Sequence, residues 1–181
     1  MKSVQKTLSN FAFVFLFGFF SCTSQQHATV SESSKADAAL KKKYATILGV
    51  DEKQITNLAL YKFIDEWYGT PYKYGGKTKE GIDCSDLVCV LYAQVYKKTI
   101  SGSASSLYDN CDVIAQKNLE EGDLVFFKID SDKVSHVGIY LQNRHFLHAS
   151  SHHGVIINSL DEAYYVKYFF KGGRIKSVTS K

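Results

Sequence analysis

Residues 135–150 read SHVGIYLQNRHFLHAS, and this stretch contains two short apolar segments that each carry one histidine. In the first segment polar and apolar side chains alternate, which is typical of a β-strand with one buried face. His136 lies on one face of this strand, and the opposite face carries Val137, Ile139 and Leu141. His148 lies in the second segment. The pattern predicts strands over residues 134–141 and 146–150.

The two histidines can share a site only if they lie on the same face of the sheet. Side chains alternate along a strand, so a register shift of one residue moves a side chain to the opposite face. If the strands are neighbours, a connection with an odd number of residues, three around Asn143 and Arg144, brings the histidines together. A two-residue Asn143-Arg144 turn would separate them, and Asn-Arg is not the Asn-Gly signal of such a turn. Taken alone, each histidine is an ordinary surface imidazole.

Cys84 is the side chain for which a histidine pair could serve as a proton partner. It follows Asp83, a favourable helix N-cap, and begins a helix that the apolar spacing predicts over residues 84–97. The positive end of a helix dipole favours a thiolate over a thiol. A catalytic imidazole needs a third group to set its tautomer, and a second histidine can do this. A buried structural cysteine is the alternative, which describes Cys89 and Cys111 better.

The remaining pattern predicts one α+β domain, with N-terminal helices packed on a mainly antiparallel sheet. Helices are expected over 55–67, 84–97 and part of 103–117, and a glycine-rich loop over 69–83. Further strands are expected over 124–127 and 155–158, and a last strand or helix follows before Arg174. The domain spans residues 44–181. Residues 22–43 lack a hydrophobic period and are expected to form a flexible tether.

The first 21 residues resemble a bacterial lipoprotein signal peptide. Two lysines precede an apolar run over residues 11–20, which is too short to span a bilayer comfortably, and Cys22 follows a small residue. This pattern predicts cleavage before Cys22 and a lipid on its sulfur, which would anchor the chain to a membrane. An ordinary secretory signal cut elsewhere is the alternative, because Phe19 stands where an aliphatic residue is commoner.

The composition of the 181-residue chain excludes several other functions. Its formal net charge of +4 is not the dense stripe of Lys and Arg that nucleic-acid binding needs. The four cysteines contain no Cys-x-x-Cys pair, so a thiolate zinc site is not expected. If one cysteine carries lipid, three remain, and in an export compartment at least one of these is a free thiol.

Five motifs in this order resemble the NlpC-type cell-wall peptidases, a compact branch of the papain-like superfold. They are YGTPYKYGG at 68–76, GIDCS at 81–85, GDLVFF at 122–127, SHVGIY at 135–140 and HAS at 148–150. The resemblance covers about residues 55–174 and is greatest to the small lipoprotein murein endopeptidases. It implies hydrolysis of amide bonds in peptidoglycan stem peptides or cross-links, through a thiolate and an acyl-enzyme.

The resemblance also implies roles for individual residues. Cys84 is similar to the family nucleophile, His136 to its general base and His148 to the residue that orients the base. Tyr72 resembles a tyrosine beside the nucleophile, which donates to the oxyanion or contacts substrate. Asp83 and Ser85 match positions that flank a substrate amine pocket. No metal or cofactor is implied. The expected protein is a monomer in the bacterial envelope, anchored at the outer membrane, with peptidoglycan peptides as partners and any regulatory protein unknown.

The chain departs from this family pattern in two places. Asp86 stands where the family usually has glycine. Its carboxylate favours the helix N-terminus, but it would raise the pKa of Cys84 if it pointed inward, and it could also select a basic substrate group. Residues 101–107 lack the arginine that family members often carry there. The substrate side of the groove is therefore the least predictable part of the site.

Three rival functions stay open from the sequence. A metal-dependent hydrolase would use His136 and His148 with His152 or His153, although no His-Glu-x-x-His helix is present. A non-catalytic cell-wall-binding lipoprotein could use the same fold. An acyl transferase would keep the thiol chemistry and pass the acyl group to an amine or alcohol. The remaining histidines are expected at the surface or groove edge, and the tyrosines of the pair at 164–165 in packing roles.

Overall fold

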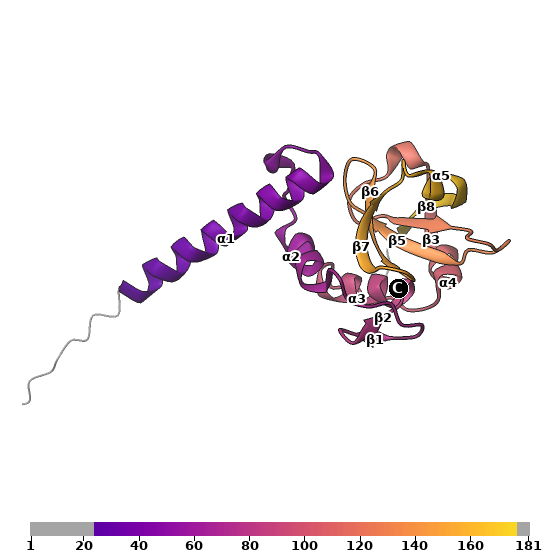
Figure 1. Ribbon diagram of the computed structural model, residues 1–181, viewed down its shortest axis with the longest axis horizontal. Coiled ribbons are helices and arrows are strands. Elements are labelled where there is room, and N and C mark those ends of the chain that lie inside the picture. Colours follow the sequence, from indigo (N-terminus) through magenta and orange to yellow (C-terminus); the bar gives the residue numbers. More distant parts are fainter. Residues whose placement is uncertain (1–23, 177–181) are drawn as a thin grey trace, which may run out of the picture. The chain divides into compact units, whose positions relative to one another are not determined.

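The computed structural model describes residues 24–176, and the predicted signal peptide and Cys22 lie outside the described residues. The chain divides into two compact units, one ending at Lys35 and the other beginning at Ala36. Helix α1 (Ser24–Leu48) contains this boundary. The second unit carries all of the remaining elements (Figure 1). No helix among the described residues is long and apolar enough to cross a membrane.

Helix α1 replaces most of the flexible tether that the sequence predicted. The stretch contains no glycine or proline, and its alanines, lysines and glutamate are good helix formers. At its C-terminal end the helix buries the side chains of Tyr44, Ala45 and Leu48. The helix ends at Gly49, whose φ of 63° is left-handed, and the Val50 N–H donates to the Ala45 carbonyl at 3.0 Å. This pairing is a Schellman-type ending.

Three short helices and one 3₁₀ turn precede the sheet. They are η1 (Glu52–Gln54), α2 (Leu58–Trp67), α3 (Cys84–Gln94) and α4 (Ala104–Asp109). Helix α2 begins three residues later than the sequence predicted, because the side chain of Asn57 caps it by accepting from the Leu60 N–H at 3.2 Å. The predicted loop before α3 also contains a small hairpin of β1 (Lys77–Thr78) and β2 (Gly81–Ile82).

The main sheet has six strands in the order β3-β8-β4-β5-β6-β7, and each pairs antiparallel with its neighbours. The strands are β3 (Cys111–Ile114), β4 (Leu124–Phe127), β5 (His136–Tyr140), β6 (His145–Ser150), β7 (Gly154–Ser159) and β8 (Phe169–Ile175). A 3₁₀ turn, η2 (Gln116–Asn118), and helix α5 (Ala163–Tyr168) complete the domain. The predicted α+β class with helices on an antiparallel sheet is confirmed.

The two faces of the sheet have separate apolar cores. Helix α3 packs on β5 and β6 through one face, which carries Val137 and Leu147. The other face carries Phe127 and Phe146 and is covered by α5, which contributes Tyr165 to the same cluster. The aromatic content of the chain is thus divided between the two layers. His136 of β5 and His148 of β6 lie on the face covered by α5, opposite the side chains that contact α3.

The connection between β5 and β6 has the length that the shared face requires. Ile139 pairs with Leu147, and Tyr140 pairs with Phe146. The Leu141 N–H then donates to the His145 carbonyl, so the connection consists of the three residues 142–144. Asn143 and Arg144 both have left-handed φ values, 46° and 63°. The predicted three-residue connection is confirmed, and the two-residue turn is excluded.

Gly138 lets the two histidine-bearing strands approach each other. A Cβ at this position would lie 2.7 Å from Cδ2 of Phe146 and 2.8 Å from the backbone oxygen of Leu147. It would also lie 3.3 Å from the Cβ of His148. The Phe146 ring could turn away, but the backbone oxygen can move only with β6 itself. A side chain here would therefore push β5 and β6 apart beside the histidines.

We expect Gly138→Ala to lower the free energy of unfolding by about 2 kcal/mol, the usual cost of overpacking a dense core. The measurement is urea denaturation of the variant and the wild type, followed by tryptophan fluorescence. An unchanged midpoint would contradict the tight approach of the strands at Gly138.

Candidate active site

Cys84 is held at the first turn of α3 by the N-cap residue before it. Asp83 accepts from the Asp86 N–H at 2.8 Å and from the Ser85 hydroxyl at 2.9 Å through Oδ1, and from the Gly75 N–H at 2.9 Å through Oδ2. The carboxylate thus closes the helix end and ties it to the loop before it. Cys84 is 8% exposed and packs in the core between α3 and the sheet.

The sulfur of Cys84 meets the sheet next to the first histidine. The backbone N–H of Val137 is directed at the thiol, and so are the N–H groups of Ser85 and of Cys84 itself. Val137 directly follows His136 in β5. The nucleophile candidate of α3 therefore lies beside the residue that follows the base candidate of β5.

The two histidines form a direct hydrogen-bonded pair. Nε2 of His136 lies 2.8 Å from Nδ1 of His148, and the ring planes are nearly perpendicular. His148 is 2% exposed, whereas His136 is partly exposed. The His136 ring packs against Phe127 with a centroid distance of 5.9 Å, and the His148 ring packs against Phe146 with a centroid distance of 4.9 Å. The structure thus joins His136 and His148 directly, and it places Cys84 beside Val137, the residue that follows His136.

Three further polar residues extend this network, and the sequence reasoning did not identify them. Nε2 of His148 lies 2.9 Å from Oδ1 of Asn158 and 3.1 Å from the Tyr165 hydroxyl. Asn158 in turn donates to the carboxylate of Glu162 at 2.9 Å. Tyr165 packs as predicted, but its hydroxyl also contacts the histidine. No sequence signal marks Asn158, because its place beside His148 depends on the pairing of β6 with β7. His148 pairs with Ile156, and a residue two positions further shares its face.

Burial determines the protonation states of the resting site. Desolvation raises the pKa of the Cys84 thiol to about 11, and the charge of Asp83 adds to this, while the three N–H groups at the sulfur oppose it. Desolvation also lowers the pKa of His136, with a contribution from His148, and it lowers the pKa of His148. The helix dipole was expected to favour a thiolate, but desolvation outweighs it. The resting pair is a neutral thiol beside a neutral imidazole.

A groove of about 470 Å³ opens over the histidine pair. Its lining includes Tyr72, His136, His148, Ser150, His152, His153, Asn158, Glu162, Tyr164 and Tyr165. Tyr72 is partly buried, and its backbone bridges to Ile82, two residues before the cysteine. Burial raises the pKa of Tyr72, so its hydroxyl keeps its proton and can donate. His152 and His153 lie at the groove edge, as predicted.

Asp83 and Ser85, predicted beside a substrate amine pocket, are placed differently from Tyr72. Neither residue lines the groove. Asp83 is 7% exposed, and both of its oxygens already accept from the protein. The Ser85 hydroxyl donates to Asp83. In this structure the two residues build the helix end that holds Cys84.

The two departures from the family pattern have partners of their own in the structure. Asp86 forms an ion pair with Lys77 of the β1–β2 hairpin at 3.4 Å. Burial, and after it the charge of Asp86, raises the pKa of Cys89. Asp83 is the carboxylate whose charge raises the pKa of Cys84. The segment without arginine forms the start of α4, where the Ser103 hydroxyl accepts from the Ser106 N–H at 3.3 Å.

Within residues 24–176 no group of three or more His, Cys, Asp or Glu side chains is arranged to hold a metal ion. The three cysteines in this range are free thiols. The nitrogens of the histidine pair that point toward each other are occupied by their mutual hydrogen bond.

Comparison with known proteins identifies relatives over most of the domain. The family model described as NlpC/P60 family matches residues 69–174. A Haemophilus influenzae protein described as a probable endopeptidase NlpC homolog is 39% identical over 117 residues, 65% of this chain and 62% of that protein. The Escherichia coli K12 protein murein DD-endopeptidase MepS/murein LD-carboxypeptidase is 33% identical over 153 residues, 84% of this chain and 79% of that protein. An NlpC/P60 family protein from Bacillus cereus has a TM-score of 0.61 at 24% identity, over 66% of this chain and 40% of that chain, which shows the fold alone.

We expect alkylation of Cys84 by iodoacetamide to be slow at pH 7 and to rise about tenfold for each pH unit up to pH 10. The reason is that only the thiolate reacts, and burial raises the pKa of Cys84 to about 11. Peptide mass spectrometry of native protein measures the rate, and urea-unfolded protein is the control. A rate that reaches its plateau below pH 8 would contradict the neutral resting thiol.

Proposed function

The chain belongs to the NlpC/P60 family, and we propose that it is a cysteine peptidase that hydrolyses amide bonds in peptidoglycan stem peptides or cross-links. One observation carries the proposal. Cys84 meets β5 at the residue after His136, and His136 is hydrogen-bonded to His148 at 2.8 Å. The Haemophilus and Escherichia relatives are named as a probable endopeptidase and a murein endopeptidase, and these names support the substrate class.

The proposed reaction begins with a neutral thiol and imidazole. Cys84 gives its proton to His136 as the sulfur attacks the amide carbonyl, which produces a tetrahedral oxyanion. The backbone N–H of Cys84 and the Tyr72 hydroxyl are the candidate oxyanion donors. His136 then returns the proton to the leaving amine, and the C–N bond breaks to leave a thioester. Water, deprotonated by His136, attacks the thioester and releases the carboxylic acid and the thiol.

A neutral resting pair has a consequence for this mechanism. Because burial opposes both a thiolate and an imidazolium, charge separates only when substrate stabilises the products of proton transfer. The oxyanion donors supply that stabilisation during attack. The resting enzyme would therefore react slowly with small electrophiles and faster with a bound peptide that fills the groove.

We also propose that the mature protein is lipid-anchored through Cys22 in the bacterial envelope, at the outer membrane. The support is the sequence pattern of the first 22 residues together with a family relative named for murein, which lies in the envelope. A lipid would hold the peptidase domain near the cell wall.

A non-catalytic wall-binding protein is the second candidate, and the site geometry favours the peptidase over it. Binding a peptide does not need two mutually hydrogen-bonded histidines, one of them buried, near a thiol. Burying polar groups in this way has a cost that a catalytic role explains.

The proposal predicts that the full chain, kept in solution with detergent, converts purified muropeptides into new fragments, while Cys84→Ala yields none. Loss of the nucleophile should lower the rate by at least about a thousandfold, since the thioester cannot form. Mass spectrometry of the products identifies the bond. Cys89→Ala is the matched control, because this thiol is partly exposed on the same helix, and it should keep wild-type activity.

Fragments should also form in the presence of a chelator. Equal fragmentation by wild type and Cys84→Ala would show that Cys84 is not the nucleophile. Fragmentation abolished by chelator would support the metal-dependent alternative. Peptide binding without any fragmentation, across several wall types, would support the wall-binding alternative.

The lipid anchor predicts incorporation of labelled palmitate into the wild-type chain and its loss in Cys22→Ser. The Cys22→Ser protein should move from the membrane pellet to the soluble fraction, because the lipid is the proposed anchor and each of its buried CH₂ groups adds about 0.8 kcal/mol to membrane affinity. Cys89→Ser is the control and should keep the label. Label retained in Cys22→Ser would disprove attachment at this sulfur.

A further inference from the structure

A line of hydrogen bonds runs from the histidine pair to the molecular surface. It passes from His136 to His148, then to the amide of Asn158 and to the carboxylate of Glu162. The four residues come from β5, β6, β7 and the N-cap of α5. The buried part of the line contains no ionised group, and its charged end is exposed.

The last member of this line determines the direction of all the others. The carboxylate of Glu162 can only accept, so the Nδ2 amide group of Asn158 must face it, at 2.9 Å from both oxygens. The Oδ1 of Asn158 then faces His148 and can only accept, so the proton of His148 lies on Nε2. Its bare Nδ1 accepts from His136, which places the proton of His136 on Nε2 as well. Nδ1 of His136 is left as the free acceptor.

We propose that Asn158 and Glu162 are positioning residues that hold His136 in the tautomer able to take the thiol proton, an inference that rests on the proposed peptidase function. Neither residue touches the reacting atoms. They act through His148 by setting which nitrogen carries its proton. The alternative tautomer of His136 would present a donor, and a donor cannot accept the proton of Cys84.

Glu162 also has an electrostatic role during proton transfer. When the proton moves from the sulfur to Nδ1 of His136, a positive charge develops on the histidine pair, and no other bond changes. The charge of Glu162 and the hydrogen bond of Asn158 both raise the pKa of His148, against the lowering by burial. Among the described residues, Cys84 from α3, Tyr72 from the loop before β1 and Tyr165 from α5 lie beside the pair. The groove over the pair is also lined by three further titratable residues, Tyr164 of α5 and His152 and His153 of the turn between β6 and β7.

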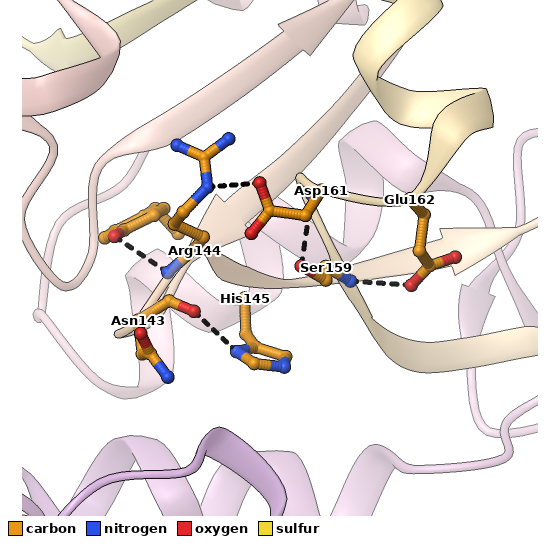
Figure 2. Close-up of polar contacts among 7 residues, drawn as sticks. Asn143, Arg144, His145, Ser159, Asp161 and Glu162 are labelled. Atoms are coloured by element: carbon orange, nitrogen blue, oxygen red, sulfur yellow. Dashed lines mark hydrogen bonds and ion pairs between the residues drawn. The ribbon is translucent and has the colours of Figure 1, made fainter.

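The geometry at Glu162 shows why this carboxylate stays in place. One oxygen also accepts from the Ser159 N–H at 2.7 Å, which closes the turn between β7 and α5. Figure 2 shows that the neighbouring carboxylate, Asp161, is turned instead to the guanidinium of Arg144, with Nε at 2.6 Å. Asp161 therefore carries the same charge in the same turn without joining the line to the histidines.

The direct test reads the tautomers by long-range ¹H–¹⁵N NMR of the full chain, with signals assigned from His136→Gln and His148→Gln. Both rings should be protonated at Nε2 in the wild type. Asn158→Leu should leave His148 as a mixture of tautomers. The paired exchange Asn158→Asp with Glu162→Gln should restore a single tautomer, because the carboxylate at 158 accepts and the amide at 162 donates. An Nδ1-protonated His148 in the wild type would overturn the proposal.

The kinetic test compares Glu162→Gln with Asp161→Asn on the muropeptide substrate. Glu162→Gln should lower kcat by about tenfold with KM unchanged, which is typical of a lost orienting contact. The acidic limb of its pH profile should move to lower pH, because removing the charge lowers the pKa of the histidine pair. Asp161→Asn should change neither quantity. An increased KM at constant kcat would mean that Glu162 contacts substrate and would overturn the positioning role.

The two measurements separate this inference from the proposed function. If wild type shows the expected tautomers but cleaves no muropeptide, the peptidase proposal fails and the positioning geometry stands. If wild type is active, and Asn158→Leu and Glu162→Gln keep both rings protonated at Nε2 with an unchanged kcat, the positioning proposal fails and the peptidase proposal stands.

Discussion

The shared face of His136 and His148 is the constraint on which the site depends. It follows from the register of β5 and β6, which a connection of three residues sets. A shift of one residue would move His148 into the core beneath α3, where an imidazole would have no polar partner. Gly138 then allows the backbones to approach closely enough for a 2.8 Å contact between the rings.

A second consequence of this arrangement is the low polarity around the rings. The face that carries the histidines is the aromatic layer covered by α5, with Phe127, Phe146 and Tyr165 around them. Such surroundings favour neutral forms, and the pKa values of both histidines fall accordingly. The same surroundings make each hydrogen bond electrostatically stronger than in water. A polar network inside this layer therefore has well-defined donors and acceptors.

Local patterns predicted much of this architecture, and packing explains what they missed. Alternation placed His136 and His148 on one face, and the Asp83 cap placed Cys84 at a helix start, because both follow from backbone geometry alone. The α1 helix was missed because, among its described side chains, the buried ones are Tyr44, Ala45 and Leu48 at its C-terminal end, and an exposed helix leaves no apolar period in the sequence. The raised pKa of Cys84 was missed because the N-cap position indicates a dipole but says nothing about desolvation. The line through Asn158 needed the pairing of β6 with β7, which no local pattern provides.

The location of the charge in this network follows from the cost of burying it. A carboxylate placed directly on His148 would be ionised inside an aromatic layer, which costs several kcal/mol unless further partners compensate. Asn158 occupies that place as a neutral group and can be fully satisfied there. Glu162 is the next member of the hydrogen-bonded line and lies at the surface, where its carboxylate is exposed to solvent and accepts from the Ser159 N–H. The arrangement keeps the orienting effect of an anion while its charge stays at the surface.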